Sequence, residues 1–89
     1  MIKSTLTISN KLGLHARASA KLTKLAGGFK AEVFMTRNGR RVNAKSIMGV
    51  MMLAAGIGTT VELETNGDQE QPAMDALVAL MNDKFGEGE

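Results

Sequence analysis

The chain contains a single histidine, His15, and an arginine two residues later, Arg17. Turn-forming residues up to Gly13 are followed by an apolar periodicity, which predicts a helix that starts close to His15. Free backbone amides and the positive end of the helix dipole attract anions there, and the Arg17 guanidinium can bind phosphate oxygens in pairs. The same dipole favours the neutral imidazole, which is the nucleophilic form. We therefore predict that His15 attacks phosphorus, while Arg17 and the amides of Ala16 and Ala18 bind the phosphate.

Several other kinds of site are excluded by residue types that the chain lacks. It has no cysteine, so disulfides, thiolate catalysis and cysteine-bound zinc cannot occur. One histidine cannot build a histidine-rich metal site. There is no glycine-rich nucleotide loop and no acidic metal pair, so the chain can hold a phosphoryl group but cannot extract one from ATP. These features predict a carrier and not an enzyme, with no metal and no cofactor.

The secondary structure follows from apolar periodicity and turn residues. We expect the first helix to end at Gly27-Gly28 through a left-handed glycine. Asn38-Gly39 is a strong type I′ hairpin signal, because both central residues of that turn need a positive φ. Ser46 is a good N-cap for a short second helix that stops at Gly56. The elements expected are strands at 2–8, 31–37, 40–44 and 61–65, helices at about 15–27 and 47–55, and a third helix with Pro72 in its first turn and an apolar stripe of Ala73, Leu77, Leu80 and Met81.

This order, βαββαβα, predicts an α+β fold. Each strand has one polar face and each helix has one apolar stripe. The simplest arrangement is an open-faced two-layer sandwich, in which a four-stranded antiparallel sheet carries the three helices on one face. The 89 residues should form a single domain, 1–89. We expect the tail from Gly86 to Glu89 to fray.

The composition favours a globular protein and gives little support for a nucleic-acid or membrane partner. Hydrophobic residues make up 44% and charged residues 22%, with a net charge of +2, which is too small to indicate nucleic acid. A rival hypothesis is a small nucleic-acid-binding module, but three Phe and no Trp or Tyr make a base-stacking sheet hard to assemble. The apolar run from 47 to 57 is too short to cross a bilayer. Without a signal-peptide pattern we expect a cytoplasmic location and no membrane partner.

Two motifs together resemble those of a known family. Gly13-Leu14-His15-Ala16-Arg17 matches the phosphohistidine signature of the HPr phosphocarriers of the bacterial phosphoenolpyruvate-dependent phosphotransferase system, and Lys45-Ser46 matches their second phosphorylation site. The resemblance covers essentially the whole chain. It implies that Enzyme I phosphorylates His15 at Nδ1 and that an EIIA-type acceptor receives the group. It also implies that an HPr kinase/phosphorylase modifies Ser46, which should weaken docking of Enzyme I. We expect a monomer.

The chain departs from the family pattern in one place and matches two branches of the family in others. The family usually has proline after the arginine, whereas this chain has Ala18, whose N–H could be an additional phosphate donor. The stretch from 8 to 13 is similar to the nitrogen-related regulatory branch, and Lys45-Ser46 is similar to the sugar-transport branch. Sugar transport is the leading prediction, and the nitrogen branch is the alternative.

The second helix carries more apolar surface than a short helix can bury. We expect Val50 and Leu53 to be core residues and about half of the remaining apolar residues to face outward. Flexible methionines there would form a docking surface for several partners. A purely regulatory protein switched at Ser46 alone is a third hypothesis, but it leaves the pattern around His15 unexplained. The predicted partner-binding residues are Ala20, Lys24, Lys45, Ile47, Met48, Met51 and Met52, with Arg17 at their edge.

Overall fold

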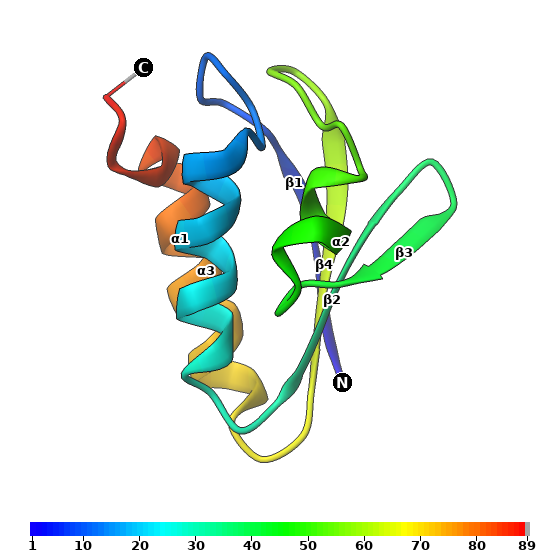
Figure 1. The fold of residues 1–89 in the computed structure, drawn as a ribbon. Helices are drawn as coiled ribbons and strands as arrows, with labels where there is room; N and C mark the ends of the chain where they lie inside the picture. Colours follow the sequence, from blue (N-terminus) through cyan, green and yellow to red (C-terminus); the bar gives the residue numbers. More distant parts are fainter. Residues whose placement is uncertain (89) are drawn as a thin grey trace.

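The computed structural model describes residues 1–88, which form one sheet and one layer of helices (Figure 1). The order of elements along the chain is β1 (Ile2–Thr7), α1 (Ala16–Gly27), β2 (Glu32–Arg37), β3 (Arg40–Asn43), α2 (Ile47–Met51), β4 (Thr60–Asn66), α3 (Glu70–Asn82) and the 3-10 turn η1 (Lys84–Gly86).

The sheet has the strand order β1-β4-β2-β3, and every neighbouring pair is antiparallel. The three α-helices cover one face of this sheet, while the other face is open (Figure 1). The predicted α+β architecture is therefore confirmed. The register of β1 and β4 places Leu6 opposite Val61, so both of these apolar side chains lie on the helix-covered face.

The core fills the space between the sheet and the helices. On α1, the inward residues Ala18, Leu22 and Ala26 are fully buried, in agreement with the predicted stripe. They pack in one cluster with sheet residues such as Leu63 and helix residues such as Leu77. Burial of this stripe determines how α1 lies on the sheet, and therefore where the helix begins.

The hairpin between β2 and β3 forms as predicted. Asn38 and Gly39 have φ values of 51° and 81°, which is the pair of positive angles that a type I′ turn requires. Arg37 lies opposite Arg40 in the ladder on either side of this turn.

Helix α1 ends at Gly27 as predicted but without the predicted conformation, and the predicted end of the second helix is wrong. Gly28 caps α1 with φ −80°, so the helix ends without a left-handed glycine, and the Gly28 amide bonds to the Leu25 carbonyl at 3.1 Å instead. The second helix ends at Met51, well before Gly56. Leu53 turns into the core and Ala54 takes a positive φ of 50°, so the backbone leaves the helical path there.

The C-terminal segment is packed against the molecule, and the prediction that it frays is wrong for Gly86 and Glu87. Phe85 is 1% exposed, and its carbonyl accepts a 2.7 Å hydrogen bond from Lys21 on α1. Burial of the Phe85 ring stabilises this segment and offsets the tendency of a chain end to fray. In Figure 1 this segment, in red, returns beside the start of α1. Glu89 lies outside the described residues.

Within residues 1–88, no helix combines the length and apolar character that crossing a membrane requires.

Candidate functional site

His15 is the N-cap residue of α1, as its place in the sequence predicted. Its backbone is extended, with φ −73° and ψ −179°, and its side chain makes no cap hydrogen bond to the helix. The first helical hydrogen bond runs from the Ser19 amide to the His15 carbonyl at 2.9 Å. The amides of Ala16, Arg17 and Ala18 have no hydrogen-bond partner among residues 1–88, so they are free to bind an anion.

The turn before His15 is fixed by a close approach of two backbones. Gly13 has φ 66°, and a Cβ atom there would lie 2.4 Å from the Ala55 carbonyl oxygen. That same oxygen accepts a 2.9 Å hydrogen bond from the Leu14 amide, and Leu14 itself is buried. Only glycine fits this position without displacing the backbone. The turn therefore fixes the position of the His15 backbone at the helix start.

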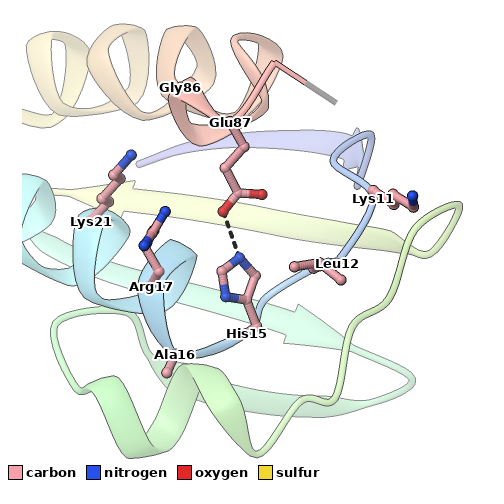
Figure 2. A pocket seen from close by; sticks show the side chains of 8 residues that line it. All are labelled: Lys11, Leu12, His15, Ala16, Arg17, Lys21, Gly86 and Glu87. Atoms are coloured by element: carbon pink, nitrogen blue, oxygen red, sulfur yellow. Dashed lines mark hydrogen bonds and ion pairs between the residues drawn. The ribbon is translucent and has the colours of Figure 1, made fainter.

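One ring nitrogen of His15 is held by a residue that the sequence analysis did not predict. Nε2 lies 2.5 Å from Oε2 of Glu87, and Oε1 of the same carboxylate accepts a 3.0 Å hydrogen bond from Nδ2 of Asn10. An ionised carboxylate can only accept, so Nε2 carries the proton in this contact. In a neutral ring the lone pair is then on Nδ1, which lies on the side of Ala16 and Arg17 (Figure 2).

The ring of His15 is partly covered by the side chain of Glu87. The His15 side chain is 28% exposed and the Glu87 side chain 12%. Glu87 adds a negative charge beside the ring, and no pattern in the sequence indicates this contact. Nδ1, on the side of Ala16 and Arg17 (Figure 2), makes no hydrogen bond among the described residues.

The pocket around His15 is mainly cationic. Its volume is about 640 Å³, and Arg17, which makes no hydrogen bond or ion pair within residues 1–88, extends from α1 beside the histidine (Figure 2). An exposed guanidinium without a partner can reorient around an incoming phosphate. The residues that line the pocket are Lys11, Leu12, His15, Ala16, Arg17, Lys21, Gly86 and Glu87.

The charge on Glu87 is stabilised by its surroundings. The hydrogen bond from Asn10 lowers the pKa of the Glu87 carboxyl, and the hydrogen bond and charge of His15 and the charge of Lys21 lower it further, against an opposing effect of burial. The carboxylate is therefore ionised at neutral pH.

Ser46 is the N-cap of α2, as predicted. Its Oγ accepts a hydrogen bond of 3.1 Å from the Gly49 amide, and the short helix follows directly. The neighbouring Lys45 donates from Nζ to the Phe29 carbonyl at 3.0 Å, which fixes the side chain that was expected to face partners.

The apolar residues of α2 are more exposed than predicted. Val50 and Leu53 are buried as expected. The prediction that only about half of the other apolar residues face outward is wrong. The four side chains concerned are all between 38% and 70% exposed. A helix of five residues turns only one side to the core, and Val50 occupies it. We call these four residues the α2 patch, and they are Ile47, Met48, Met51 and Met52.

The predicted partner-binding residues on α1, Ala20 and Lys24, share one exposed side of the helix with Ala16. Ala16, Ala20 and Lys24 are exposed and follow each other at intervals of four residues, which places them on one face. Helix α1 packs against α2, so the His15 end of α1 and the α2 patch belong to neighbouring elements.

The residues that the sequence analysis missed reach the site from distant or unremarkable positions. Glu87 is separated from His15 by 72 residues, and no periodicity connects them. Asn10 was interpreted only as a turn residue, yet its side chain is fully buried. Lys11 and Leu12 lie in the stretch that is similar to the nitrogen-related branch, but neither they nor Lys21 were predicted to line the site. The only available signal was Phe85, a lone aromatic residue near the end of the chain that could have anchored the tail.

Comparison with known proteins identifies the chain. A family model described as the PTS HPr component phosphorylation site, where PTS denotes the phosphotransferase system, matches residues 2–83. The chain belongs to the HPr family. It is a phosphocarrier of the phosphotransferase system, as the two motifs predicted.

Relatives and solved structures support this membership over the full length of the HPr chain. The phosphocarrier protein HPr of Cupriavidus necator H16 is 71% identical over 89 residues, which is 100% of both chains. The crystal structure of HPr-C-His from Thermoanaerobacter tengcongensis has a TM-score of 0.95 at 44% identity and covers 98% of each chain. A crystal structure of an HPr dimer from the same organism has a TM-score of 0.79 at 44% identity, covering 98% of this chain and 100% of that one.

The first prediction concerns Gly13. Gly13→Ala should lower the free energy of unfolding by about 2 kcal/mol, because the new Cβ meets the Ala55 carbonyl and the backbone has a positive φ. Urea unfolding followed by circular dichroism measures this change. Gly27→Ala is the matched control, because a Cβ there meets nothing within 4 Å; it should change stability by less than about 1 kcal/mol. Equal effects of both substitutions would contradict the account of the turn.

The second prediction concerns the pH dependence of the Glu87 contact. The pKa of this carboxyl is lowered in the folded chain from its usual 4.5, so its contribution to stability is present above pH 4.5 and is lost as the pH falls through the lowered value. The wild type should therefore be more stable than Glu87→Gln at neutral pH, and this difference should shrink as the solution is acidified below 4.5. Urea midpoints of both proteins across that range test the sign. A difference that grows on acidification would refute it.

Proposed function

We propose that His15 accepts a phosphoryl group on Nδ1 from phosphorylated Enzyme I and passes it to an EIIA-type acceptor. The observation that carries this proposal is the direction of the two ring nitrogens. Nε2 is occupied by Glu87, while Nδ1 lies on the side of the helix start, where three backbone amides lack partners within residues 1–88.

The site has groups to hold a phosphoryl group but little to make it react. The amides of Ala16, Arg17 and Ala18 and the Arg17 guanidinium can bind phosphate oxygens. Ala18 replaces the usual proline of the family and so offers an extra N–H. Binding must stay moderate, because a group held too tightly would slow the second transfer. We infer that the partner proteins supply most of the stabilisation of the transition state, so the chain acts as a carrier.

The proposed docking surface combines the His15 pocket with the α2 patch. Exposed methionines adapt to surfaces of different shape, which suits a carrier that meets a donor and an acceptor in turn. Arg17 and Lys24 would contact acidic partner surfaces beside the patch. Lys45 is fixed on the Phe29 carbonyl, and we expect it to contribute only if that bond opens.

We further propose that Ser46 is a regulatory phosphorylation site for an HPr kinase/phosphorylase. Its Oγ already accepts a hydrogen bond from the Gly49 amide at the helix start. A phosphate oxygen at this position would accept from the same amide. Phosphorylation should therefore leave α2 folded. The added charge lies directly before the α2 patch and should weaken Enzyme I docking there.

The sugar-transport and nitrogen-branch alternatives differ in the acceptor that they imply. Incubating the phosphorylated chain separately with each EIIA-type acceptor, and following the loss of label, distinguishes them. We expect a monomer in this reaction, although HPr from Thermoanaerobacter tengcongensis has been crystallised as a dimer.

The third prediction concerns the acceptor residue. His15→Ala should abolish labelling of the chain by Enzyme I and radioactive phosphoenolpyruvate, because the nucleophile is removed while the far-ultraviolet circular dichroism stays unchanged. Asp75→Asn, an exposed change on α3, is the control and should label at the wild-type rate. Labelling of His15→Ala would overturn the proposal.

The fourth prediction concerns the regulatory serine. Ser46→Asp should raise the KM of the chain as a substrate of Enzyme I by about threefold or more, with kcat nearly unchanged, because a charge at the docking surface weakens association. Ser46→Ala removes the cap and should cost about 1 kcal/mol of stability without raising this KM. An identical KM for both variants would show that the charge does not act on docking.

A further inference from the structure

The contact between Glu87 and His15 is part of a built network. Asn10 is fully buried, and its Nδ2 donates to the Gly13 carbonyl at 2.8 Å and to Glu87 at 3.0 Å. Both partners are acceptors, so the orientation of the amide is determined by them. The same buried side chain therefore fixes the turn before His15 and the carboxylate that touches its ring.

The carboxylate is also positioned by its own segment of chain. Phe85, two residues earlier, is buried in the core, and its carbonyl is bonded to Lys21 on α1. Lys84 and Phe85 both have positive φ values, 54° and 56°, so the backbone turns sharply after α3. Glu87 thus reaches His15 from an anchored turn, with little freedom to move away.

We propose that Glu87, held by Asn10, is a positioning residue that keeps the His15 proton on Nε2 and so makes Nδ1 the nucleophile. This inference rests on the proposed function and adds the group that orients the ring. A carboxylate that accepts a hydrogen bond from one ring nitrogen selects the tautomer that reacts through the other.

The transfer steps balance without a proton leaving the ring. The Nδ1 lone pair forms the bond to phosphorus while the bond from phosphorus to the donor breaks, and that electron pair leaves with the donor. The Nε2 proton stays in place, so the phosphorylated ring carries a positive charge that the Glu87 carboxylate pairs with. Transfer to the acceptor breaks the bond to Nδ1, returns its electron pair to the ring and restores the starting tautomer.

The test compares the wild type with Glu87→Gln. A glutamine has one acceptor oxygen, so it cannot accept from Asn10 and His15 in the way that two carboxylate oxygens do. In the unphosphorylated chain at alkaline pH, long-range ¹H–¹⁵N correlation spectra of the ring should show a larger fraction of the Nδ1–H tautomer in the variant. The kcat for phosphorylation by Enzyme I should fall about tenfold, and KM should change less because the substitution leaves the α2 patch unaltered.

A matched control is available, and failure of this inference can be distinguished from failure of the proposed function. Asp83→Asn makes the same acid-to-amide change four residues earlier, at an exposed position, and should leave tautomer and kcat as in the wild type. An unchanged tautomer in Glu87→Gln would overturn the inference, and so would a shifted tautomer with an unchanged kcat. Absence of labelling in the wild type would instead refute the proposed function, whereas the tautomer measurement needs no Enzyme I.

Discussion

The site depends on the close approach of Gly13 to the Ala55 carbonyl. This contact requires a residue without a Cβ at a positive φ, and it turns the chain out of β1 and into α1 within a few residues. Because the inward stripe of α1 is buried on the sheet, the helix start cannot shift to compensate for a different turn. The position of His15 beside free amides is therefore a consequence of backbone packing, and the histidine side chain contributes no cap of its own.

Opposite charges around the ring suit a group that must be both held and released. In the proposed transfer, Arg17, Lys21 and the helix amides attract the phosphoryl group. Glu87 places a carboxylate in the same pocket, where it compensates part of that positive charge before any ligand arrives. A purely cationic pocket would stabilise the phosphorylated state and slow the second transfer. With Glu87 present, the phosphorylated ring can be paired through Nε2 while the phosphate oxygens meet the cations.

The sequence predicted the features that depend on local chemistry. Asn38-Gly39 specified its turn because few residue pairs tolerate two positive φ values, and Ala18, Leu22 and Ala26 specified the buried side of α1 by their spacing. The positions of His15 and Ser46 at helix starts were predicted because the residues around a helix N-cap form a local pattern, while the chemical roles of His15, Arg17 and Ser46 stay predictions. Features that depend on distant contacts were missed or wrong. Glu87 meets His15 only because Phe85 anchors the tail, the α2 patch is exposed because Val50 alone fills the inner side of α2, and Gly28 caps α1 in a right-handed conformation.

The most direct test of the central claim is the ¹⁵N and ³¹P spectrum of the chain phosphorylated by Enzyme I after labelling of its histidine with ¹⁵N. The account predicts a phosphorus-coupled Nδ1 and a proton-bearing Nε2 on His15. A phosphate found on Nε2, or on another residue, would contradict it.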